Sequence, residues 1–270
     1  MFLLGIKSFD IIFLGDFMKI EKYTKLKGNK YNVCIDGINI KLYDDVIIKF
    51  ELLRKKEISN ELFKEIVMYN DYLEAYYKAL KYLTKRMRTE KEVYLYLIKD
   101  FDKKVVKETI AKLKNDGYLN EEVYIKCYID DQLILGNMGP NKIIKELVNL
   151  GCSHDAVNKR ITSIDDEVWL DKIEKIINKK VRLNKNYGVN KLKDKIIYEL
   201  GNMGYYKWMI DLVLKRTEFN DTDGILEKEY KKIMIKLTKK YEGNELKFKV
   251  INKLLAKGFT YEQIKKILND

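Results

Sequence analysis

The chain has 270 residues, 46% of them hydrophobic and 35% charged, which suffices for a folded core in roughly one to three domains and argues against intrinsic disorder. Its net charge of +12 favours a polyanionic partner, with nucleic acid ahead of an anionic membrane. Because six of the 53 basic residues are arginine, we expect contacts with phosphates rather than bidentate readout of bases.

The cysteines and the histidine argue against catalysis. Cys34, Cys127 and Cys152 are odd in number and widely spaced, which fits neither a disulfide framework nor a CxxC metal site. His154 is the single histidine, so no catalytic triad or zinc site can be assembled around it. No glycine-rich phosphate loop occurs. We therefore expect a protein of the reducing cytoplasm that is not an enzyme and holds no metal or cofactor.

Residues 1–17 form the one membrane-like stretch, MFLLGIKSFDIIFLGDF. It is too short to cross ~30 Å of hydrocarbon, contains Asp10 and Asp16, and lacks the basic start and the cleavage site of a signal peptide. We interpret it as a loose tail or an over-long gene start before Met18, with an interfacial anchor as the alternative.

Residues 18–71 are expected to form a small β-rich region with a linking helix. Short alternating segments rich in Tyr, Val and Ile run from Lys19 to Leu42. The pair Asp36-Gly37 predicts a two-residue hairpin turn, since both central residues of a type I′ turn need positive φ, and Gly28-Asn29 predicts another turn. The result is a three-stranded antiparallel sheet, which needs a packing partner because so small a sheet is marginal alone.

The stretch after Ser59 predicts a single helix of about six turns that supplies this partner. A buried packing face is the favoured interpretation, and stacking of its tyrosines on nucleic-acid bases is the alternative. The apolar stripe consists of Leu62, Ile66, Tyr69, Leu73, Tyr76, Leu80 and Leu83.

A capping box marks the next helix start. Thr89 is followed three residues later by Glu92, so that hydroxyl and carboxylate can each satisfy a free backbone amide. Thr260 and Gln263 repeat this arrangement near the C-terminus.

Three cations stand just before the helix start at Thr89. Lys85, Arg86 and Arg88 lie where a bound phosphate would also find free amides and the positive end of the helix dipole. A solvated charge cluster is the favoured interpretation of such a run by itself, and an anion-facing basic corner is the alternative that makes these residues binding candidates.

Three later sites share a Leu-x-x-x-Gly pattern followed by an apolar residue and a short helix. Glycine supplies the left-handed residue that ends a helix, and the next residue fills the core. A longer amphipathic helix precedes each site, so a unit of about 45–50 residues repeats. The sites are Leu147–Gly151 before Cys152, Leu200–Gly204 before Tyr205, and Leu254–Gly258 before Phe259.

The chain is therefore predicted to be mainly α-helical, with tandem three-helix repeats in an elongated array after the small β region. The repeats are expected at 72–119, 120–163, 166–220 and 225–270, with Asp221–Gly224 as the softest joint. Because each terminal repeat can cover its own edge, we expect a monomer.

The order and spacing of three segments resemble the RecX family of bacterial recombinase regulators. They are ALKYLTKRMRTEKEVYLYL, the step Gly117–Glu121, and Gly139–Ile143 continued to Gly151. The resemblance covers nearly everything from Met18 to Asp270.

Two features depart from the pattern of that family. Leu97–Phe101 is one residue shorter than the matching step in the other repeats and has Asp100 in place of glycine, which predicts a tighter or irregular helix end. The repeat turns carry Asn141, Lys142 and Lys191 where the family is richer in arginine, which argues against arginine-specific contacts.

The resemblance implies a non-catalytic cytoplasmic modulator that binds the RecA recombinase and its filament on DNA and mostly inhibits recombination and SOS-related activity. It would touch nucleic acid through phosphates and would not bind a membrane. The candidate DNA- or filament-binding residues are those of the basic corner and four later lysines: Lys85, Arg86, Arg88, Lys142, Lys191, Lys193 and Lys195.

Two other classes of function fit the residues. A sequence-tolerant or transcriptional DNA-binding module would use the three-helix units without a recombinase partner. A protein-interaction scaffold would carry its lysines as solvated faces and would bind DNA weakly at moderate salt.

Overall fold

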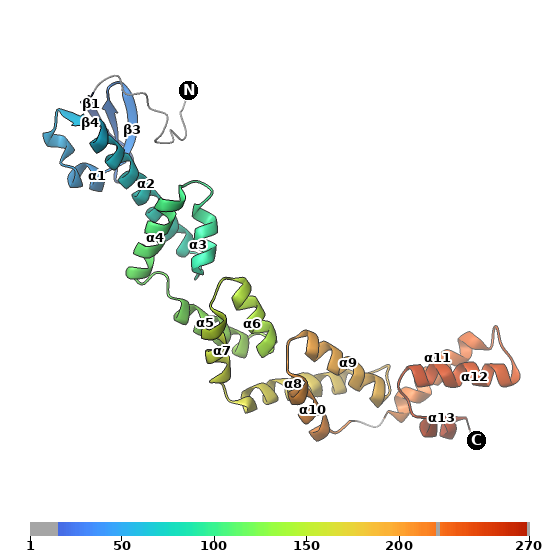
Figure 1. Ribbon diagram of the computed structural model, residues 1–270. Helices are drawn as coiled ribbons and strands as arrows, with labels where there is room; N and C mark the ends of the chain where they lie inside the picture. The colour runs from blue at the N-terminus through green and yellow to red at the C-terminus, as the bar shows by residue number, and fades with distance from the viewer. Residues whose placement is uncertain (1–15, 220–221, 269–270) are drawn as a thin grey trace. The chain divides into compact units, whose positions relative to one another are not determined.

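The computed structural model describes residues 16–219 and 222–268 (Figure 1). Residues 1–15 of the expected tail and Asp221 of the expected soft joint lie outside the described residues. The chain divides into two compact units, Met1–Tyr124 and Ile125–Asp270. Within the described part it is mainly helical with a small antiparallel sheet near the N-terminus, which confirms the predicted fold class.

The sheet has the order β3-β2-β1-β4 with every pair antiparallel, and it contains β1 (Phe17–Lys25), β2 (Lys30–Ile35), β3 (Ile38–Tyr43) and β4 (Glu57–Ser59). Asp36 and Gly37 have φ of 45° and 74°, as the predicted hairpin turn requires. The prediction of three strands was wrong, because β4 pairs with the start of β1. A three-residue strand with one apolar residue, Ile58, is too short to show an alternating pattern.

Between β3 and β4 the chain forms α1 (Asp44–Lys49) and a short 3₁₀ helix, η1 (Leu52–Arg54). The long helix α2 (Asn60–Leu83) then begins at Ser59, whose hydroxyl accepts a hydrogen bond from Leu62 N at 3.2 Å. No helix in the described part of the chain is both long and apolar enough to cross a membrane.

Helix α2 belongs to two hydrophobic cores. Its first half packs Phe63 and Ile66 with the sheet, and its second half packs Ala75 and Ala79 with α3 (Glu90–Leu97) and α4 (Lys103–Asn115). The helix therefore runs unbroken through the expected boundary between residues 71 and 72, and both neighbours depend on it.

The tyrosines of α2 serve packing within the first unit. Tyr76 donates a hydrogen bond to Asp116 Oδ2 at the end of α4 (2.5 Å), and Tyr77 donates one to Asp45 Oδ2 in α1 (3.0 Å). The rings of Tyr72 and Tyr76 stack with centroids 6.4 Å apart. These contacts favour the packing interpretation over base stacking.

The helices from α5 to α13 follow in groups of three, each with a long, a middle and a short helix. The predicted repeat boundaries nevertheless stay a prediction. The helices are α5 (Glu121–Ile134), α6 (Pro140–Asn149), α7 (His154–Thr162), α8 (Asp166–Leu183), α9 (Val189–Asn202), α10 (Lys207–Arg216), α11 (Asp223–Leu237), α12 (Gly243–Ala256) and α13 (Tyr261–Ile267).

The middle helices end as their sequences predict. In each Leu-x-x-x-Gly turn the carbonyl of the leucine accepts a hydrogen bond from the amide of the apolar residue that follows the glycine, at 3.0–3.3 Å. The glycines Gly151, Gly204 and Gly258 have φ of 96°, 88° and 86°, and the apolar residues that follow them are buried.

The preceding group of three helices, α2, α3 and α4, departs from this rule, as its sequence predicts. Helix α3 ends at Leu97, and the amides of Asp100 and Phe101 both donate to the Leu97 carbonyl, at 3.0 and 3.1 Å. The described residues contain non-glycine positive φ only at Asp36 and Glu51, so this turn closes tightly without a left-handed residue.

In the second unit, the start of one middle helix contacts the glycine turn of the next. Gly139 N donates to Met203 O at 2.7 Å, and Gly188 N donates to Lys257 O at 2.9 Å. A Cβ on Gly139 would lie 2.5 Å from the carbonyl carbon of Gly204, and a Cβ on Gly188 would lie 2.3 Å from Gly258 O. We call these backbone-to-backbone contacts the glycine joints, because no larger residue fits there.

The glycine joint predicts opposite effects for two alanine substitutions in the same helix end. G204A should lower the free energy of unfolding by about 1–3 kcal/mol, because φ is +88° and the new Cβ would lie 2.4 Å from Lys142 N. G201A is the control: it has nothing within 4 Å, and alanine in a helix should add about 0.5–1 kcal/mol. Urea denaturation measures both, and equal effects would contradict the joint.

Candidate nucleic-acid and partner interface

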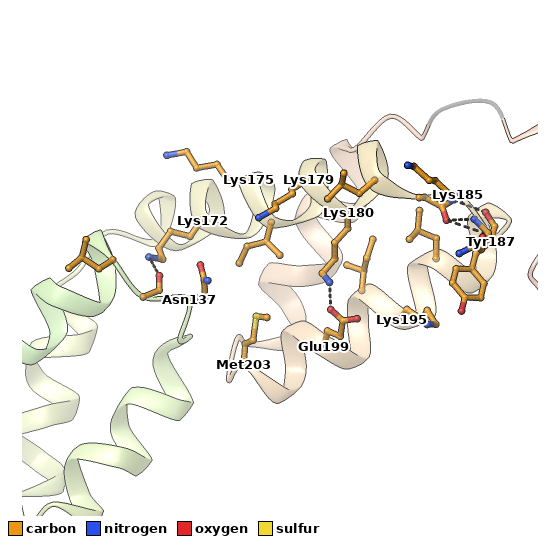
Figure 2. A pocket seen from close by; sticks show the side chains of 18 of the residues that line it. Asn137, Lys172, Lys175, Lys179, Lys180, Lys185, Tyr187, Lys195, Glu199 and Met203 are labelled. Atoms are coloured by element: carbon orange, nitrogen blue, oxygen red, sulfur yellow. Dashed lines mark hydrogen bonds and ion pairs between the residues drawn. The ribbon is translucent and has the colours of Figure 1, made fainter. Parts of the chain in front are cut away.

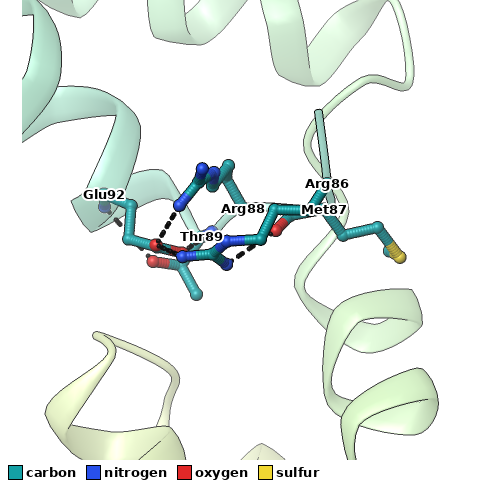
Figure 3. A network of polar contacts seen from close by, with 5 residues as sticks. All are labelled: Arg86, Met87, Arg88, Thr89 and Glu92. Atoms are coloured by element: carbon teal, nitrogen blue, oxygen red, sulfur yellow. Dashed lines mark hydrogen bonds and ion pairs between the residues drawn. The ribbon is translucent and has the colours of Figure 1, made fainter. Parts of the chain in front are cut away.

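The basic corner lies between α2 and α3 and is built around one carboxylate (Figure 3). Glu92 Oε1 accepts from Arg86 Nη2 at 2.6 Å and from Arg88 Nη1 at 3.1 Å. The predicted capping box is present, since Glu92 Oε2 accepts from Thr89 N at 3.0 Å and the Thr89 hydroxyl accepts from Glu92 N at 3.2 Å. Burial alone would raise the pKa of Glu92, but the hydrogen bonds from Thr89 N, Arg88 and Arg86 outweigh it and hold that pKa below its usual range.

The three cations of the corner are not equivalent. The Arg88 side chain is 13% exposed, its guanidinium lies 4.2 Å from the centre of the Tyr82 ring, and Tyr82 stacks on Tyr96. The Arg86 side chain is 53% exposed, and Lys85 is exposed. Arg88 is thus part of the packing of α3, while Lys85 and Arg86 present surface that an anion can reach.

Lys142 and Lys191 occupy matching positions in the first turns of α6 and α9, beside the glycine joints. A Cβ on Gly204 would lie 2.4 Å from Lys142 N, and one on Gly258 would lie 2.2 Å from Lys191 N. Both lysines are half-buried. A cation in a first helical turn opposes the helix dipole, so helix stability does not explain these lysines, whereas a bound anion would offset the repulsion.

Lys193 and Lys195 lie further along α9 and contact aromatic rings. Lys193 Nζ is 4.7 Å from the centre of the Phe219 ring, and Lys195 Nζ is 4.3 Å from that of Tyr187. Lys193 is half-buried and Lys195 is exposed.

Lys195 also lines a groove of about 690 Å³ between the end of α5, α8 and α9, which we call the lysine groove (Figure 2). Its other cations were not predicted from the sequence, although two of them, Lys175 and Lys179, share one face of a helix at a spacing of four residues. The remaining lysines of the lining are Lys172, Lys180 and Lys185.

Two lysines of the groove are engaged within the fold. Lys172 Nζ donates to the carbonyls of Gln132, Leu133 and Gly136 at 2.7–2.9 Å and thereby caps the C-terminal end of α5. Burial, and then the nearby Lys175, lower the pKa of Lys172. Lys180 forms an ion pair with Glu199.

The described residues hold no cluster of three or more histidine, cysteine, aspartate or glutamate side chains that could bind a metal ion. What the candidate regions offer chemically is positive charge with some apolar surface, and hence recognition of anions.

Comparisons with known proteins agree on one family. Residues 75–113 match the model described as "RecX, first three-helix domain". The regulatory protein RecX of Lactococcus lactis subsp. cremoris (strain SK11) is 31% identical over 269 residues, covering 93% of this chain and 97% of that protein. That of Streptococcus agalactiae serotype III (strain NEM316) is 30% identical over 259 residues, covering 94% and 99%.

Two solved structures share the fold. A crystal structure of a regulatory protein RecX matches with a TM-score of 0.64 and 22% identity, over 73% of this chain and 99% of that one. The crystal structure of RecX from Lactobacillus salivarius matches with a TM-score of 0.52 and 23% identity, over 54% and 96%.

The environment of Arg88 predicts that the two arginines of the corner differ in their effect on stability. Arg88→Ala removes a half-buried ion pair and the contact with Tyr82, and should lower the free energy of unfolding by about 1.5–3 kcal/mol. Arg86→Ala should change it by less than ~0.5 kcal/mol, because its ion pair is exposed. Urea denaturation of the full chain tests this, and similar losses would refute the distinction.

The lowered pKa of Glu92 predicts a dependence of stability on pH. A carboxylate with a depressed folded-state pKa stabilises the fold above its unfolded pKa of about 4.3, and this contribution disappears as pH falls through the folded value. Glu92→Gln keeps the capping box. The stability difference between wild type and variant should therefore be constant from pH 7 to 5 and shrink below about pH 4. Thermal unfolding measures it, and parallel curves down to the acid transition would contradict it.

Proposed function

Since the chain belongs to the RecX family of regulatory proteins, we propose that it binds the RecA recombinase and its nucleoprotein filament and mostly inhibits recombination and SOS-linked activity. The observation that carries the proposal is similarity over 93% of this chain and 97% of a relative named as a regulatory protein. The protein would act as a regulator without chemistry of its own, in the cytoplasm with its partner.

The charge of the chain and the placement of its basic residues support binding to a filament on DNA through phosphate contacts. A net charge of +12 attracts a polyanion at long range. Lys85 and Arg86 present exposed charge, and Lys142 and Lys191 repeat at matching helix starts. Such contacts release counterions and carry no base specificity, which fits a regulator that must act wherever a filament forms.

The test is a titration of the protein onto single-stranded DNA with and without recombinase, at two salt concentrations, together with strand exchange by the filament. Tighter binding to the coated DNA and slower strand exchange are expected. Equal or tighter binding to bare DNA, with no effect on strand exchange, would instead favour the DNA-binding module without a recombinase partner.

The basic corner yields a prediction about the salt dependence of filament binding. The double variant K85E/R86E should flatten the slope of log affinity against log salt by about 1.4–1.8, since each lost phosphate contact contributes roughly 0.7–0.9. Arg88 is left intact because its replacement would disturb α3. The thermal midpoint should fall only slightly, because R86E replaces an ion pair by a repulsion between carboxylates at a position that is more than half exposed.

The matched control is K55E/K56E, which makes the same charge change at two exposed lysines of the same unit. It should alter the slope by less than half as much. If the two variants behave alike, the corner is a solvated face, and Lys142, Lys191, Lys193 and Lys195 become the residues to test.

A further inference from the structure

The lysine groove combines two surface chemistries that phosphate contacts do not explain. Besides its lysines, its lining includes large apolar side chains that remain in water: Ile134 is 77% exposed, Leu135 is 83% exposed and Leu183 is 56% exposed. Exposed apolar groups rimmed by polar ones typically mark a protein interaction surface.

The cations of the groove exceed its acids. Glu199 is the acidic residue of the lining, and Lys180 already pairs with it. Within the described residues, Lys175, Lys179 and Lys185 form no ion pair and are exposed. Lys175 and Lys179 lie one turn apart on α8, so their charges can meet carboxylates that repeat with a helical spacing.

Nucleic acid matches the positive charge but not the rest of the lining. Bases bind single-strand sites by stacking on aromatic faces. The aromatic residue of the lining is Tyr187, and its ring already has Lys195 Nζ at 4.3 Å and Lys257 Nζ at 5.8 Å. Exposed isoleucine and leucine contribute nothing to phosphate binding. An amphipathic protein segment uses both chemistries.

We propose that the lysine groove binds an acidic, amphipathic segment of a protein partner. Its apolar side chains cover Ile134, Leu135 and Leu183, and its carboxylates pair with Lys175, Lys179 and Lys185. A volume of about 690 Å³ accommodates a few side chains of such a segment. Insofar as the partner is the recombinase, the inference rests on the proposed function.

The first experiment uses the full chain and a fluorescent helical peptide of leucine and glutamate, with leucine at helical spacing on one face. The control peptide has glutamine in place of glutamate. Fluorescence anisotropy should show the glutamate peptide binding at least about ten-fold more tightly. The variants I134S/L135S and K175Q/K179Q/K185Q should each weaken that binding by at least about ten-fold.

Matched controls are I235S/F248S, at exposed apolar residues outside the groove, and K228Q/K231Q/K239Q, at exposed lysines outside it. They should leave peptide binding unchanged, and all variants should keep the wild-type thermal midpoint. Equal binding of the two peptides, or equal losses in groove and control variants, would overturn the proposal.

A second arm uses a thymidine oligonucleotide in place of the peptide. I134S/L135S should leave its affinity unchanged, whereas a loss equal to that for the peptide would show nucleic acid as the occupant and overturn the proposal.

A third arm measures binding of recombinase without DNA. A wild-type chain that fails to bind recombinase refutes the proposed function. The peptide experiment then tests by itself whether the lysine groove binds an acidic, amphipathic segment.

Discussion

The backbone-to-backbone contact between glycine turns is the constraint on which the second unit depends. Gly204 and Gly258 close their turns in the left-handed region, and the carbonyls of Met203 and Lys257 just before them accept hydrogen bonds across the contact. Gly139 and Gly188 stand at the starts of α6 and α9, and their amides come close enough to donate hydrogen bonds to those carbonyls. Both sides of the contact must lack a Cβ, so the geometry is fixed by backbone hydrogen bonds rather than by adaptable side chains. The lysines next to these glycines, Lys142 and Lys191, are placed by the same contact.

The basic residues divide into those the fold uses and those it leaves in water. Arg88, Lys172 and Lys180 are held by a carboxylate or by carbonyl oxygens, and each fixes the end or the packing of a helix. Lys85, Lys175 and Lys179 have exposed side chains. The count of 53 basic residues therefore overstates the cations available to a partner, and the available ones gather at particular places. That distribution is what separates an exposed basic corner from a groove with an apolar rim.

The first unit shows a different use of one helix. The sheet is too small to be stable without a partner, and α2 supplies it while also packing against α3 and α4. Asn70 joins helix to sheet, since its side chain accepts from Tyr43 N and donates to Lys41 O, both at 3.1 Å. A buried amide with both partners satisfied fixes the register of the helix on the sheet. The periodicity of the apolar stripe gives no sign of this residue.

Local rules were enough for much of the fold. The hairpin turn at Asp36-Gly37, the capping box at Thr89 and the glycine stops after Leu147, Leu200 and Leu254 depend on φ angles and hydrogen bonds within a few residues, so the sequence alone determined them. Family membership followed from the order of such signals and was confirmed by the comparisons.

The tertiary structure decided what depends on residues distant in the chain. β4 forms because β1 offers an edge, Arg88 is packed while Arg86 is exposed because Tyr82 covers it, and Lys172 caps a helix that ends some 40 residues earlier. The lysine groove exists only where α5, α8 and α9 meet, and no pattern along the chain encodes that meeting.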